Sequence, residues 1–148
     1  MEPALAEAER LSLILLSGSF EQVHYGLAIA SAAAALARPV TLFVTLAAIR
    51  AFLAPAPDGR PAWAGLPAGP DPAGCADGGA LDARNRERGV AGFEELLQAC
   101  VGLGVEIIVC EMGLRAQGIT AAALRPDLPI QRAGLATLLA RPGQVVVL

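Results

Sequence analysis

The chain has 148 residues, of which 55% are hydrophobic, so it has enough apolar material for one buried core and we expect a single domain spanning residues 1–148. A formal net charge of −3 leaves no basic field that would attract nucleic acid, and we exclude nucleic acid as a partner.

The sequence also argues against export and membrane insertion. The first ten residues carry acidic side chains where a secretory signal would have a basic region. The apolar stretch at residues 25–49 is divided by Arg38 and Pro39, and neither part approaches the roughly 20 apolar residues that a membrane span needs. We therefore expect a cytoplasmic protein whose three cysteines stay reduced.

The first third of the chain predicts a strand, a helix and a second strand. Residues 11–16 form a short apolar run that ends at a Ser-Gly-Ser turn, and residues 20–37 have helical spacing with Ser19 as N-cap. Pro39 ends this helix, and the β-branched run at residues 40–45 predicts a strand parallel to the first. One or two helical turns are expected at residues 47–53.

Residues 54–82 form an insertion that is rich in proline and glycine and has no periodic pattern. It contains Trp63 and Cys75. Long loops of this kind are either functional lids or loosely packed segments, and the sequence leaves both interpretations open. If the segment is exposed, Cys75 offers a second thiol.

The second half predicts further alternating elements. A helix begins near Gly89 and ends at Gly102 or Gly104, with Cys100 on its apolar stripe and therefore in the core. The remaining expected elements are strands at 105–109, 128–131 and 144–148, and helices at 120–124 and 133–140. This order predicts a doubly wound, flavodoxin-like α/β/α fold of three layers, with about five mostly parallel strands.

Cys110 follows a predicted strand directly and is the main candidate for chemistry. Ligands of open parallel sheets collect at the carboxyl ends of strands, where we also expect Ser17, Gly18 and Thr45. Backbone N–H groups after the strand would stabilise a Cys110 thiolate, although Glu111 would oppose it. The alternative is that Cys110 is a small buried hydrophobic residue.

Other candidates have weaker support. His24 could approach Cys110 as a helper, although a half-exposed helix position explains it equally simply. The Ser-Gly-Ser turn lacks a nucleotide-binding fingerprint, and no residues have metal-ligand spacing, so we expect neither a cofactor nor a metal. Charged side chains before the Gly89 helix, namely Arg84, Arg86 and Arg88, indicate a solvated face.

The segment IIVCEMGLRAQGI at residues 107–119, with the order of elements before it, resembles the DsrE/DsrF-like family of sulfur-relay proteins. The match extends from Cys110 through Met112, Gly118 and Ile119. The resemblance implies a homo-oligomer in which Cys110 accepts sulfane sulfur as a persulfide from a donor protein and passes it to an acceptor protein thiol. The insertion at residues 54–82 and Glu111 lie outside this resemblance.

Two functions follow from these observations. The first is a sulfur carrier in which Ser17, Gly18, Thr45 and Met112 surround the thiol and Arg115 helps electrostatically. The second is a non-catalytic oligomeric module of the same fold that binds a small ligand at its strand ends. In the second case Cys110 only packs, so its accessibility separates the two hypotheses.

Overall fold

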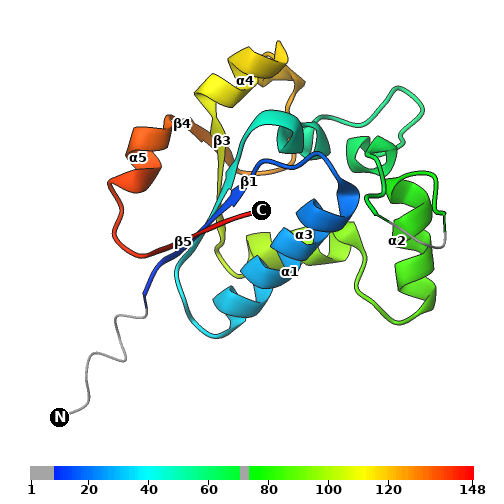
Figure 1. Cartoon of the computed structure of the whole chain (residues 1–148), viewed down its shortest axis with the longest axis horizontal. Helices are drawn as coiled ribbons and strands as arrows, with labels where there is room; N and C mark the ends of the chain where they lie inside the picture. Colours follow the sequence, from blue (N-terminus) through cyan, green and yellow to red (C-terminus); the bar gives the residue numbers. More distant parts are fainter. Residues whose placement is uncertain (1–8, 71–73) are drawn as a thin grey trace.

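The computed structural model describes residues 9–70 and 74–148, and its centre is a five-stranded sheet (Figure 1). All strand pairs are parallel, and the strand order is β4-β3-β2-β1-β5. This confirms the predicted α/β class with a parallel sheet. The strands are β1 (Leu11–Leu15), β2 (Val40–Val44), β3 (Glu106–Cys110), β4 (Ile130–Ala133) and β5 (Gln144–Val147).

In the described residues, five α-helices and three short 3-10 helices join the strands. The α-helices are α1 (Phe20–Ala35), α2 (Gly78–Glu87), α3 (Phe93–Gly102), α4 (Glu111–Gln117) and α5 (Leu135–Leu139). The 3-10 helices are η1 (Leu46–Phe52), η2 (Ala62–Gly65) and η3 (Ala121–Ala123). Among the described residues, no helix is long and apolar enough to span a membrane.

The first face of the sheet carries the main core. Alternate residues of β1, namely Leu11, Leu13 and Leu15, are buried there. Helices α1 and α3 lie together on this face (Figure 1). Ser19 caps α1 by accepting a hydrogen bond from the N–H of Gln22, as predicted.

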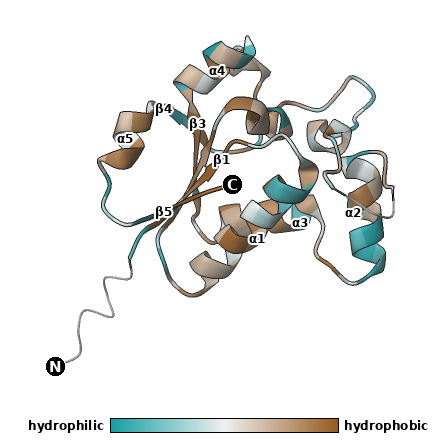
Figure 2. Ribbon diagram, viewed as in Figure 1, coloured by the Kyte–Doolittle hydropathy of each residue, from teal (hydrophilic) through white to brown (hydrophobic). Residues whose placement is uncertain are grey.

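The second face has much thinner cover. Its core is a small cluster of four buried residues, and only α5 among the helices contributes to it; the cluster is Phe43, Ile108, Cys110 and Leu138. Leu135 and Leu139 of α5 are exposed, as are Val145 and Val147 of β5. Figure 2 shows brown, hydrophobic colouring on α5 and β5. This face therefore presents apolar side chains to solvent in the single chain.

Two α-helices and the 3-10 helix η2 were not predicted. Helix α2 begins at Gly78, inside the proposed insertion, because Asp77 caps it by accepting a hydrogen bond from the N–H of Ala80. Arg84 and Arg86 precede α3, as expected, but they lie in the last turn of α2. Helix α4 follows Cys110 without a loop, and α3 starts at Phe93, later than the expected Gly89.

The segment of residues 62–68, which we call the covering segment, is packed onto the domain. Its Trp63 is buried and stacks on Phe93, with ring centroids 4.9 Å apart, and lies 5.8 Å from the Phe20 ring. The carbonyls of Pro67 and Ala68 accept hydrogen bonds from the N–H groups of Phe20 and Glu21. The interpretation of loose packing is therefore wrong for this part of the insertion.

Candidate functional site

Cys110 is the last residue of β3 and the N-cap of α4. Its Sγ accepts a hydrogen bond from the backbone N–H of Gly113 at 3.4 Å, in the position that a serine or threonine oxygen usually takes. The sequence placed this thiol correctly at a strand end. The sequence also suggested backbone N–H donors after the strand, but it did not reveal that α4 begins at the next residue and supplies one from Gly113.

The Cys110 side chain is only 1% exposed. It points to the second face of the sheet, where it packs with Phe43, Ile108 and Leu138. Ala133 of β4 pairs with it across the sheet and packs against the same cluster. Leu138 is the one member of this cluster that comes from a helix, so α5 is the layer between the thiol and solvent.

The side chain of Thr45 packs against α4 at Gly113, the residue whose N–H donates to Cys110 Sγ. A Cβ at position 113 would lie 2.5 Å from Thr45 Oγ1 and 2.8 Å from the backbone N of Leu46, far inside normal contact distance. Only glycine therefore allows α4 to approach η1 this closely. The close packing of α4 on η1 also fixes the position of the Gly113 N–H, which donates to Cys110 Sγ.

The other predicted neighbours of the thiol lie elsewhere. Met112 is 60% exposed and Arg115 is exposed on α4. Within the described part of the chain, no hydrogen bond joins Arg115 to Cys110. Ser17 accepts a hydrogen bond from the N–H of Ser19 at the end of β1, and β2 separates that strand from β3.

His24 does not pair with Cys110. It is buried on α1, where its Nε2 lies 2.8 Å from the carbonyl oxygen of Ala91 and its ring stacks on Phe20. Helix α1 covers the first face of the sheet, whereas Cys110 points to the second face. The expectation of a half-exposed His24 is wrong, because α3 and the segment before it cover this helix face.

The remaining cysteines are packed in or against the main core. Cys100 is fully buried on α3, as predicted, and burial raises the pKa of its thiol to about 11. Its Sγ donates to the carbonyl of Leu27. Cys75 is half-buried against the main core, in contrast to the exposed thiol expected from the loop sequence.

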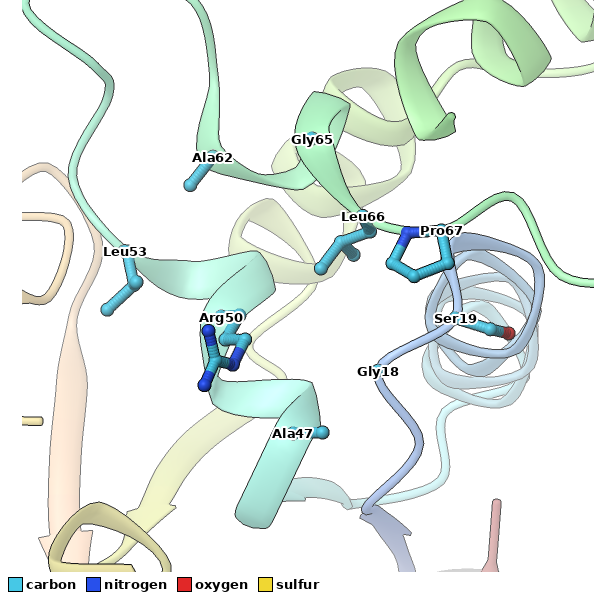
Figure 3. Close-up of a pocket in the computed structure, with 9 residues that line it drawn as sticks. All are labelled: Gly18, Ser19, Ala47, Arg50, Leu53, Ala62, Gly65, Leu66 and Pro67. Atoms are coloured by element: carbon cyan, nitrogen blue, oxygen red, sulfur yellow. The ribbon is translucent and has the colours of Figure 1, made fainter. Parts of the chain in front are cut away.

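A cavity of about 660 Å³ opens at the carboxyl ends of β1 and β2, and we call it the strand-end cavity. Figure 3 shows the residues of η1 on one wall and residues of the covering segment on the other. Of the predicted pocket residues, only Gly18 lines it. The described residues that line it are Gly18, Ser19, Ala47, Arg50, Leu53, Ala62, Gly65, Leu66 and Pro67.

Sequence reasoning missed most of these residues. The strand-end rule, together with the helical turn expected at residues 47–53, is the signal that could have identified Ala47 and Arg50. Leu66 and Pro67 gave no comparable indication, because a proline-rich segment without periodicity has no predictable partner. The closeness of Gly18 to η1 is clear only in the structure, where a Cβ on Gly18 would lie 2.9 Å from the Cβ of Ala47.

An ionic cluster joins the covering segment to the second half of the chain. Trp63 Nε1 donates to Glu94 Oε1 at 2.9 Å, and Arg125 forms ion pairs with Glu94 and Asp127. Partial burial acts to raise the pKa of Glu94, but hydrogen bonds from Arg125 and Trp63 outweigh it and hold that pKa below 4.5. The cluster is a structural anchor for the cavity wall.

The described residues contain no group of three or more histidine, cysteine or acidic side chains suited to a metal ion.

The sequence matches no known protein family and no curated protein. By structure, the chain is similar to the crystal structure of the ychN protein from E. coli, with a TM-score of 0.60 and 14% identity. The similarity covers 95% of this chain and 99% of that one. The five parallel strands and their helices therefore have the fold of the ychN protein, a DsrE-like fold.

Proposed function

We propose that the protein is a sulfur carrier in which Cys110 holds sulfane sulfur as a persulfide. The observation that supports this proposal is the placement of Cys110 Sγ at the N-cap of α4, where the N–H of Gly113 points at the sulfur. A backbone N–H donor stabilises negative charge on sulfur, and the thiolate is the attacking form in sulfur exchange. The DsrE-like fold agrees with this proposal.

The exchange has two balanced steps. The Cys110 thiolate attacks the outer sulfur of a donor persulfide, a new S–S bond forms, and the donor S–S bond breaks to release the donor thiolate. An acceptor protein thiolate then attacks the outer sulfur on Cys110, and the Cys110 thiolate leaves. No external oxidant or reductant is consumed.

Because Cys110 is buried, sulfur transfer requires that its cover moves. Helix α5 has five residues, and of these only Leu138 is buried. Short elements with few buried side chains open at low free-energy cost. We therefore propose that α5 moves away from the second face when a donor or acceptor approaches.

The test is the intact mass of the protein after treatment with inorganic polysulfide. The wild type is expected to gain the mass of sulfur, and the Cys110→Ser variant is expected to gain none. Cys100→Ser, which changes a fully buried thiol on α3, should keep the wild-type gain. Glutathione should then remove the added sulfur. Equal labelling of wild type and Cys110→Ser would contradict the proposal.

The second candidate function is a module that binds a small ligand in the strand-end cavity while Cys110 only packs. Two observations favour it: the thiol is 1% exposed, and Cys110 does not line the cavity. Native protein that remains unlabelled by polysulfide, but gains label at Cys110 after unfolding in urea, would favour this candidate over sulfur transfer.

We also propose that the protein forms a homo-oligomer through the second face of the sheet. Val145 and Val147 pair with Ser12 and Ile14 of β1, so their side chains lie on that face, and they are 44% and 56% exposed. Exposed apolar side chains grouped on two neighbouring elements, α5 and β5, are typical of contacts between protein chains. A second copy of the chain offers a matching apolar face through two-fold symmetry.

A further inference from the structure

We infer that the strand-end cavity binds a small organic anion with an apolar body, and that Arg50 holds its anionic group. The inference rests on the second candidate function, because it names the site and the ligand class of that function. It does not depend on the chemistry of Cys110, which lies outside the cavity.

The lining determines the apolar part of the ligand. Apart from Arg50 and the glycines, the described lining consists of alanine, leucine and proline side chains and the hydroxyl of Ser19. Leu66 of the covering segment is buried, and Leu53, directly after η1, lies across from it (Figure 3). A volume of about 660 Å³ is typical of sites that enclose a small organic molecule.

Among the lining residues that the structure describes, only Arg50 is charged. Its Nε and Nη2 donate to Oε1 of Gln117 at 3.2 and 3.1 Å, and this neutral amide orients the guanidinium without cancelling its charge. Within the described residues, no carboxylate lies at ion-pair distance from Arg50. A guanidinium beside apolar walls attracts an anion more strongly than one in bulk water.

The nearest alternative anion site is the N-terminus of α1, and its first N–H groups are already used in hydrogen bonds within the protein. Helix α1 starts at the edge of the cavity, and its first N–H groups would normally attract an anion. Here the N–H groups of Phe20 and Glu21 donate to the carbonyls of Pro67 and Ala68, and that of Gln22 donates to Ser19 Oγ. An anion in this cavity therefore depends on Arg50.

The cavity is preformed. Its outer wall is fixed by the Trp63 stacking, by the bond from Trp63 to Glu94 and by the bonds to α1. Its inner wall starts at Leu46, which has a φ of 51°, a left-handed conformation that is rare for a bulky side chain. Strain of this kind persists where the surroundings impose it, and it occurs often at binding sites.

The experiment is a titration of ¹⁵N-labelled protein followed by amide chemical shifts. The probes are hexanoate, hexan-1-ol and hexylamine, which share an apolar chain and differ in charge. We expect hexanoate to bind most tightly and to shift the amides of Gly18, Ala47, Gly65 and Leu66. Arg50→Gln should weaken hexanoate binding about tenfold, and Arg50→Lys should weaken it less. Arg132→Gln, at an exposed position on β4, is the matched control and should bind like wild type.

The outcomes separate the inference from the function on which it rests. Equal binding of the three probes in the cavity, or unchanged hexanoate affinity in Arg50→Gln, would overturn the anionic ligand class but leave the cavity as a binding site. Failure of all three probes to shift cavity amides would overturn both the inference and the second candidate function. Retained folding of each variant is checked by its amide spectrum.

Discussion

Gly113 shows how much of the site depends on one missing side chain. The residue sits inside α4, where alanine would ordinarily favour the helix by about 1 kcal/mol. Against this, a Cβ would meet the Leu46 backbone at 2.8 Å, and backbone atoms cannot move aside without shifting η1. The steric effect should therefore exceed the helix propensity.

We predict that Gly113→Ala lowers the free energy of unfolding by about 1–3 kcal/mol, the usual cost of overpacking. Urea unfolding measures this difference. Gly102→Ala is the matched control, because that glycine ends α3 and has open space around it, so the change should be neutral or stabilising. An equal loss of stability in both variants would contradict the steric explanation.

At the scale of elements, α5 is the cover of Cys110. We predict that Leu138→Ala increases the rate at which Cys110 reacts with 5,5′-dithiobis(2-nitrobenzoate) several-fold, because removing a buried leucine weakens the packing of the helix. The measurement uses a Cys75→Ser background. Cys100 contributes little, because burial raises the pKa of its thiol to about 11.

The matched control is Leu139→Ala, whose side chain is 57% exposed on the same helix. This variant should react at the wild-type rate. If both variants react equally fast, general loosening of the domain explains the result and α5 has no specific role as a cover.

The covering segment is an element whose attachment depends on pH. The pKa of Glu94 lies below its ordinary value of 4.5 in the folded protein, so its ion pair and hydrogen bond stabilise the fold above about pH 4.5. This stabilisation is lost as the pH falls through the lowered pKa. Protonation removes the negative charge of Glu94, so its ion pair with Arg125 is lost.

We predict that the wild type loses more stability between pH 7 and pH 3 than Glu94→Gln does. Fluorescence of Trp63, the only tryptophan, reports urea unfolding and the local contact. Glu87→Gln changes an exposed carboxylate on α2 and should retain the wild-type pH dependence. Identical pH dependence of wild type and Glu94→Gln would show that the Glu94 pair does not anchor the segment.

At the scale of the whole molecule, the proposed homo-oligomer depends on the second face of the sheet. We predict that Val147→Glu shifts the protein to monomers, measured by light scattering coupled to size-exclusion chromatography, because a charge at an apolar contact is costly to desolvate. Leu36→Glu is the control, since Leu36 is 77% exposed at the end of α1, on the other side of the sheet. Dissociation of both variants, or of neither, would argue against this face.

The sequence predicted the sheet more completely than the site. Apolar runs marked four of the five strands closely, and Pro39 marked the end of the first crossover, because burial on a sheet leaves a local pattern. Helix α2 was hidden by Gly78 and Gly79, whose low helix propensity is overridden by the Asp77 cap and by packing on η2.

The site depends on pairs of residues that are far apart in the chain. Cys110 was found because it follows a strand, but its burial by Leu138 comes from α5, which follows the next strand, β4, further along the chain. Arg50 and Leu66 meet across the cavity only because the covering segment folds back over β1 and β2 (Figure 3). No local periodicity encodes either arrangement.

The bonds from Phe20 and Glu21 to the covering segment also limit how this protein can be engineered. Shortening proline-rich loops is a common route to thermal stability. Here the loss of Pro67 would leave the N–H of fully buried Phe20 without its acceptor, at a cost of about 1–3 kcal/mol. Trimming is expected to be tolerated only at the exposed turn of residues 56–59, so the insertion contains both a replaceable tip and an indispensable base.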